Sequence, residues 1–160
     1  MAIRRKSAIW YFFRAPIHLY QWHLGWILGH RFVLLTHTGR RTGKLRQTVL
    51  EVLEYRTSGP EVVVMGGFGR ESDWIQNIEA LPNVQIDIGS RHFPACAHAL
   101  SEEEAVEALK GYEYRNRWMA PVVRFALGRL VGWRYTSSDE DRRRMARQMP
   151  FFAFQAEPSG

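Results

Sequence analysis

Two strand-like runs, joined by a basic segment that contains glycine, constrain the fold of this 160-residue chain most strongly. Residues 32–38 lead into the segment and residues 47–55 follow it. A strand, a glycine-containing turn and a second strand predict a β-hairpin with a long loop. Alternation along the second run predicts two faces, one with Val49, Leu53 and Tyr55 and the other with Leu50 and Val52.

The loop of this hairpin has the composition of an anion-binding turn. Gly39 and Gly43 permit a close approach of the backbone, and cationic side chains lie between and after them. Backbone N–H groups and guanidinium groups in one turn suit phosphate or carboxylate. The alternative is a solvated basic hairpin tip. A P-loop is excluded because it requires four residues between its glycines and a hydroxyl after its lysine, whereas Leu45 follows Lys44 here.

Charge and cysteine usage narrow the function classes. The formal net charge of +6 favours an anionic partner, which includes a phosphorylated ligand, an anionic membrane surface or nucleic acid. Cys96 is the only cysteine, so an intrachain disulfide is impossible. The length predicts one domain that spans residues 1–160. The sequence shows neither a GxSxG motif nor a metal-ligand cluster, so we expect no metal site.

The rest of the chain predicts four further strands and several helices. The strands are expected over residues 61–65, 84–88, 91–100 and 151–155. Helices are expected over residues 73–80 after Ser72, 101–110 with a capping box at Ser101 and Glu104, 121–132, and 139–148 after Ser138. About six strands with mostly short connections predict an α+β, mainly β fold: a small antiparallel barrel with flanking helices.

Residues 1–30 are basic and rich in tryptophan. Pro16 is expected to open an amphipathic helix that runs toward Gly29. Polar and charged residues interrupt it too often for a membrane-spanning helix. The segment is expected either to lie in a membrane interface or to pack on the protein or on a second subunit. The oligomeric state stays open, with a homodimer as one option.

No pattern predicts catalysis by side chains alone, which points to a bound cofactor. The hairpin loop would hold its phosphate, and the Gly66–Gly67 break would let a flat ring approach the backbone. Trp74 and Asn77 share one face of the short helix and would frame the cofactor. The alternative for this pair is core packing by Trp74 and helix capping by Asn77.

Two segments of the chain resemble a known family. Residues 38–46, Thr-Gly-Arg-Arg-Thr-Gly-Lys-Leu-Arg, resemble the T-G-R-K/R-S/T-G-x-x-R signature of the deazaflavin-dependent nitroreductase family. Residues 73–84 resemble its second signature, W-x-x-N-(L/I)-x-A-x-P-x-V. The similarity covers residues 30–100 and a C-terminal strand. It departs from the family at Gln47-Thr48, where Thr-Pro is frequent, and at Met65, where a hydroxyl is frequent.

The resemblance implies a split β-barrel that binds reduced coenzyme F-420, an 8-hydroxy-5-deazaflavin with a phosphate and an oligoglutamate tail. It implies hydride transfer from that cofactor to quinones, nitro compounds or similar acceptors. The implied cofactor-binding residues are Arg40, Arg41, Thr42, Arg46, Gln47, Thr48, Val49, Met65, Gly66, Gly67, Asp73, Trp74 and Asn77. Tyr112 and Tyr114 correspond in place to a tyrosine that approaches substrate in related enzymes.

Two alternatives remain from the sequence. One is an enzyme that uses flavin mononucleotide (FMN) on the same barrel, because the glycine hairpin suits either phosphate. The other is a non-catalytic basic module, in which the hairpin and the arginine-rich helix 139–148 bind RNA or an anionic membrane. Nucleic acid is not expected as a partner, because a regular aromatic and basic alternation is lacking. We expect a cytoplasmic protein, at the inner face of the cell membrane if residues 1–30 bind lipid.

Overall fold

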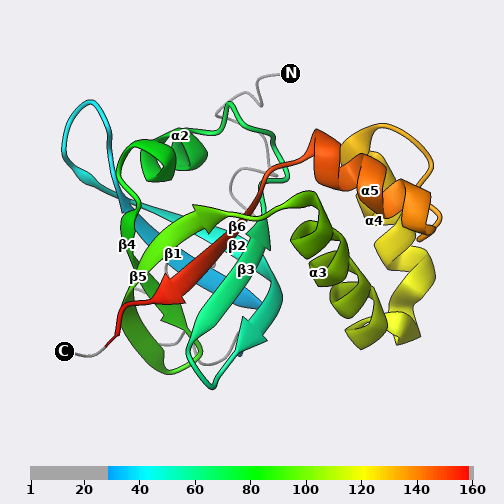
Figure 1. The fold of residues 1–160 in the computed structure, drawn as a ribbon, viewed down its shortest axis with the longest axis horizontal. Helices are drawn as coiled ribbons and strands as arrows, with labels where there is room; N and C mark the ends of the chain where they lie inside the picture. Colours follow the sequence, from blue (N-terminus) through cyan, green and yellow to red (C-terminus); the bar gives the residue numbers. More distant parts are fainter. Residues whose placement is uncertain (1–28, 159–160) are drawn as a thin grey trace.

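A closed barrel of six antiparallel strands forms the centre of the computed structural model, which describes residues 29–158 (Figure 1). The strands follow the order β1-β2-β3-β6-β5-β4 around the barrel, and β4 pairs back with β1. Their bounds are β1 Phe32–Thr38, β2 Leu45–Arg56, β3 Glu61–Met65, β4 Asn83–Ile88, β5 Arg91–Ala99 and β6 Phe151–Ala156. The expected split β-barrel with flanking helices is confirmed. The helix expected from Pro16 lies outside the described residues, apart from its end at Gly29.

Helices cover one end and one side of the barrel. Their bounds are α2 Asp73–Ala80, α3 Glu102–Arg115, the short 3₁₀ helix η2 Arg117–Met119, α4 Ala120–Val131 and α5 Asp139–Gln148. Helix α2 closes one end, while α3 lies beside the barrel with α4 and α5 on its far side (Figure 1). Within residues 29–158, no helix has the length and apolar character needed to span a bilayer.

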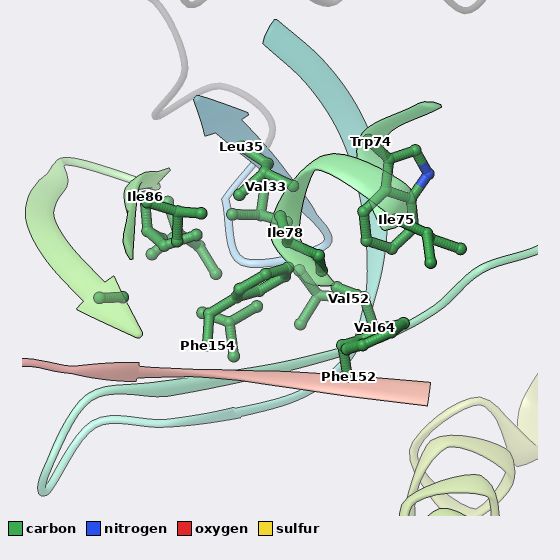
Figure 2. Close-up of a cluster of buried hydrophobic side chains, with 14 residues drawn as sticks. Val33, Leu35, Val52, Val64, Trp74, Ile75, Ile78, Ile86, Phe152 and Phe154 are labelled. Carbon is green, nitrogen blue, oxygen red and sulfur yellow. The ribbon is translucent and has the colours of Figure 1, made fainter. Parts of the chain in front are cut away.

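The interior of the barrel is filled by one apolar cluster (Figure 2). Alternate strand residues point inward, as the two-residue period of a β-strand requires. Helix α2 adds Trp74, Ile75 and Ile78, and the Trp74 and Phe152 rings meet edge to face with centroids 5.9 Å apart. This packing holds α2 against the end of the barrel, which fixes its position relative to the β1–β2 hairpin.

A bulge in β2 changes the faces expected from simple alternation. The pairing of β2 with β3 shifts register between Val52 and Glu54. An extra residue at that point puts Tyr55 on the same side as Leu50 and Val52, in the barrel interior, while Leu53 faces the helices. The expected grouping of Tyr55 with Leu53 is therefore wrong, because a bulge has no clear signal in the alternation.

A second apolar cluster joins the outer face of β2, β3 and β6 to helices α3, α4 and α5. The capping box of Ser101 and Glu104 is confirmed at the start of α3. Helix α3 does not end at Gly111 as expected but continues to Arg115. Tyr112 is buried in this cluster and donates a hydrogen bond from its hydroxyl to Glu51 over 2.7 Å, which stabilises the last turn despite the poor helix propensity of glycine.

Candidate functional site

A cavity of about 450 Å³ lies where the β1–β2 loop faces helix α2. It is lined by His37, Gly39, Arg40, Arg41, Thr42, Arg46, Gln47, Thr48, Asp73, Trp74 and Asn77. These lining residues include nine of the thirteen that the resemblance implies as cofactor-binding. Two segments that are distant in sequence, the hairpin loop and α2, therefore meet at one cavity.

The loop between β1 and β2 is held tightly by its own backbone. The Gly39 N–H donates to the Lys44 carbonyl over 2.8 Å, and the Gly43 N–H donates to the Gly39 carbonyl over 2.8 Å. Gly43 has a φ of +67°, a conformation that glycine adopts without steric cost. A Cβ on Gly39 would lie 2.9 Å from the Thr42 hydroxyl oxygen. The loop is thus a compact turn that requires glycine at both positions.

Arg40 fastens this loop to helix α2. Its guanidinium donates to Asn77 Oδ1 over 2.9 Å, to Gln76 Oε1 over 2.8 Å and to Asp73 Oδ1 over 3.3 Å. Its backbone N–H also donates to Asn77 Oδ1, over 3.0 Å. The guanidinium is therefore occupied by protein acceptors, so Arg40 positions the loop on α2.

Asn77 continues this polar contact into the barrel. Its Oδ1 accepts two hydrogen bonds from Arg40, so its Nδ2 is the atom that faces His37 Nδ1 at 3.1 Å. An amide nitrogen can only donate, so Nδ1 accepts and the neutral ring carries its proton on Nε2. Both side chains are buried, with 4% exposure each. Hydrogen bonds link Arg40 to Asn77 and Asn77 to His37, and this series determines the tautomer of the histidine.

His37 is neutral across the physiological range. Burial lowers its pKa most, the positive charge of Arg46 lowers it further, and Asp73 opposes the shift, which brings the pKa to about 4. Arg46 is the direct partner of His37 in the β1–β2 pairing. The cavity wall therefore presents an uncharged ring beside an arginine.

Among residues 29–158, the remaining cations of the cavity, Arg41 and Arg46, have no anionic partner. Among the described residues, neither Arg41 nor Arg46 forms an ion pair, whereas Asp73 is paired with Arg40. Both arginines are exposed residues, Arg41 in the loop and Arg46 at the start of β2. The rim of the cavity thus carries uncompensated positive charge, which attracts phosphate or carboxylate.

Four of the residues implied by the resemblance are placed away from this cavity. They are Val49, Met65, Gly66 and Gly67. A Cβ on Gly66 would lie 2.5 Å from Ile75 Cδ1 and 2.8 Å from Pro150 Cγ, and one on Gly67 would lie 3.3 Å from Leu130 Cδ1. Protein atoms therefore pack closely against this glycine pair.

The structure also does not bring the two tyrosines to the cavity. Tyr112 is buried between α3 and the barrel, where burial and the Glu51 carboxylate raise the pKa of its hydroxyl. Tyr114 is 67% exposed on the same helix and stacks against the guanidinium of Arg117 at 4.4 Å. Neither hydroxyl lines the cavity in this chain.

His37 is the site residue that the sequence predictions missed. It follows Val33 and Leu35 at two-residue spacing, and both of these point into the barrel. The alternation of β1 therefore already predicts an inward side chain at position 37. A histidine at the end of a row of inward-pointing residues, next to a loop with several arginines, is the sequence pattern that indicates a site residue here.

Comparison with known proteins identifies the family. The profile of the family described as F420H(2)-dependent quinone reductase matches residues 15–120. A solved structure described as an F420-H2 dependent reductase (FDR-A) is 22% identical, covers 79% of this chain and 95% of that chain, and has a TM-score of 0.52. Another, described as a domain-swapped dimer, is 20% identical, covers 87% of this chain and 98% of that chain, and has a TM-score of 0.51.

No curated protein matches the chain. The two solved structures share the fold, and the family match extends over more than half of the sequence. The chain therefore belongs to the F420H(2)-dependent quinone reductase family, whose members are oxidoreductases that depend on coenzyme F-420.

Proposed function

We propose that the cavity between the β1–β2 loop and α2 holds coenzyme F-420, and that the enzyme reduces a small quinone or nitro compound beside it. The observation that carries this proposal is the pair of uncompensated arginines, Arg41 and Arg46, on the rim of the cavity. Family membership supports the cofactor, while its location and the acceptor are our inference.

The residues of the cavity fit an anionic cofactor with a phosphate and a carboxylate tail. Arg41 and Arg46, which have no carboxylate partner among the described residues, can each donate hydrogen bonds to an oxyanion. Among the described residues that line the cavity, Asp73 is the one carboxylate, and Arg40 neutralises it. The electrostatic balance therefore favours an anion.

The buried part of the cavity would orient the cofactor by neutral contacts. His37 holds a proton on Nε2, Asn77 fixes that tautomer, and the Trp74 ring adds an apolar wall. The bound cofactor supplies the hydride, so the protein needs no general base for that step. We infer that water supplies the proton to the reduced acceptor, because the Tyr112 hydroxyl already donates to Glu51. The protein's own contribution is orientation and exclusion of solvent.

A fluorescence titration with coenzyme F-420, run in parallel with FMN, tests the cofactor site. We expect saturable binding of the deazaflavin, weakened roughly tenfold or more in Arg46→Ala and in Arg41→Ala, because each loses a charge-assisted hydrogen bond. Arg91→Ala on β5 is the matched control, since Arg91 does not line the cavity. Equal affinity of Arg46→Ala and the wild type would contradict the phosphate role, and tight binding of FMN alone would replace the cofactor.

Arg40→Ala separates positioning from direct contact. This change removes three acceptor contacts between the loop and α2. We expect it to lower both thermal stability and cofactor affinity, whereas Arg41→Ala should lower affinity alone. An Arg40→Ala protein with unchanged stability and the same loss of affinity as Arg41→Ala would show that Arg40 contacts the cofactor directly.

A further inference from the structure

Helix α4 exposes a second apolar face, opposite the one that packs on the protein. Val123, Leu127 and Val131 are buried in the outer cluster. Trp118 just before the helix and Val122 and Phe125 within it are 77%, 58% and 71% exposed. Val122 and Phe125, three residues apart, share one face of α4, and Trp118 precedes them in η2; we call these three side chains the apolar stripe. Large apolar side chains that gather on one exposed face mark an interaction site.

The same surface carries arginines that form no ion pair within the described part of the chain. From Tyr114 to Ser138 the sequence contains Arg115, Arg117, Arg124, Arg129 and Arg134 and neither Asp nor Glu. Arg115 turns inward to the Leu53 carbonyl. Within residues 29–158, none of the other four arginines forms an ion pair. The described ion pairs of arginine are those of Arg31, Arg40, Arg56, Arg70, Arg142 and Arg147.

A cavity beside the stripe brings these features together. Its volume is about 680 Å³, and it lies between α4 and the segment that follows the helix. Arg124, Arg129 and Arg134 line it together with the rings of Phe125 and Trp133. Guanidinium groups and aromatic rings around one hollow suit the phosphate of a lipid headgroup, with the apolar stripe beside it reaching the acyl chains.

We propose that the outer face of η2 and α4 docks onto an anionic lipid surface. An interfacial helix combines aromatic and aliphatic side chains with arginines at its polar boundary, and this face has that composition. Charge complementarity selects the lipid over a second copy of the chain, because a symmetric pairing of this face would bring arginines against arginines. Helix α4 begins at residue 120, where the family match ends, whereas η2 lies within the matched residues.

This inference is independent of the proposed acceptor and of the cofactor position. Helix α4 lies on the far side of α3 from the barrel (Figure 1), and none of the residues of its exposed face lines the cavity at α2. Substitutions on it should therefore leave cofactor affinity unchanged. Failure of lipid binding and failure of cofactor binding are thus separate results.

Flotation with vesicles of phosphatidylcholine, with and without phosphatidylglycerol, tests the proposal on the full chain. We expect the wild type to bind the anionic vesicles and to be released as salt is raised. Phe125→Ser should weaken binding roughly tenfold, because an inserted aromatic side chain is lost, and Arg129→Glu by about fivefold or more. Arg91→Glu, which has the same change in net charge, is the control. Absence of binding by the wild type would overturn the proposal.

A site-specific label distinguishes this face from any other part of the chain that binds lipid. In a Cys96→Ala background, Val122→Cys and Ser58→Cys carry an environment-sensitive fluorophore at α4 and at the β2–β3 turn. We expect a blue shift and quenching by lipid-borne quenchers at position 122 but not at 58. Equal signals at both positions, or vesicle binding of Phe125→Ser equal to wild type, would place the lipid contact elsewhere. Self-association that Phe125→Ser abolishes, without vesicle binding, would assign the face to a second copy.

Discussion

Asn77 Nδ2 lies 3.1 Å from His37 Nδ1, so helix α2 and strand β1 are joined by a buried hydrogen bond between residues forty positions apart. Because Asn77 Oδ1 accepts from Arg40 at the same time, the amide cannot turn over without breaking both sets of contacts. This one side chain aligns the loop, the helix and the strand that form the cavity.

Replacement of Asn77 by alanine should disturb the fold and the site together. The change leaves the Arg40 donors and His37 Nδ1 without their buried partner, so we expect a loss of about 1–3 kcal/mol in the free energy of unfolding. Urea denaturation measures this loss, and cofactor affinity should fall in parallel. Gln76→Ala is the matched control, because it removes one contact to Arg40 but leaves the His37 contact intact. A similar loss in both variants would contradict a special role for Asn77.

The buried neutral His37 predicts a defined pH dependence of stability. Its pKa is about 4 in the folded protein and 6.5 in an unfolded chain. Between these values only the unfolded chain takes up the proton, so the stabilisation is complete above pH 6.5 and is lost as the pH falls toward 4. The expected loss is about 2 kcal/mol, below the roughly 3 kcal/mol of the full shift, because the adjoining cavity admits water.

Paired denaturation curves at pH 4.5 and pH 7 isolate the contribution of His37. The difference in unfolding free energy between the two pH values should shrink in His37→Gln, whose side chain does not titrate. His98→Gln, at an exposed position on β5, should keep the wild-type difference. If His37→Gln also keeps it, the ring is not held neutral by burial.

Gly66 and Gly67 should differ sharply in their tolerance of alanine. A Cβ on Gly66 meets the fully buried side chains of Ile75 and Pro150 at 2.5 and 2.8 Å, and the proline ring cannot turn away. We expect Gly66→Ala to cost about 1–3 kcal/mol of stability through overpacking. The nearest atom to a Cβ on Gly67 is Leu130 Cδ1 at 3.3 Å, on a flexible and partly buried side chain, so Gly67→Ala should change the thermal midpoint little. Equal midpoints for the two variants would disprove the packing argument.

Glu113 on α3 is expected to stabilise the packing of α3 against α5. It accepts hydrogen bonds from Arg142 of α5 at 2.6 Å and from the buried Tyr135, and its side chain is 11% exposed. Glu113→Ala leaves the Arg142 guanidinium, 16% exposed, with only the exposed Asp139 as an acidic partner and leaves the Tyr135 hydroxyl without its acceptor, so we expect a loss of about 3 kcal/mol. Glu107→Ala breaks the exposed pair with Lys110 and should cost less than about 1 kcal/mol. Cofactor affinity should be unchanged in both, which a fluorescence titration checks.

Local patterns in the sequence determined most of the secondary structure and the loop between β1 and β2. The strand bounds at 32–38 and 61–65 and the helix at 73–80 agree with the expectation, because alternation, glycine and proline act on neighbouring residues. Ser101 and Ser138 cap their helices as expected, whereas the Ser72 hydroxyl makes no capping hydrogen bond. Each of the two signature segments predicted residues that line the cavity, such as Arg46 in the first segment and Trp74 in the second.

Tertiary structure decided the features that depend on contacts between distant segments. The inward side of Tyr55 follows from a bulge, and the length of α3 follows from the burial of Tyr112 against β2. Whether Arg40 is free to bind a ligand could not be known until α2 was placed beside the loop, since its acceptors lie more than thirty residues away. A sequence specifies which groups carry charge and hydrogen bonds, but packing decides which of these groups already have partners and which remain for a ligand.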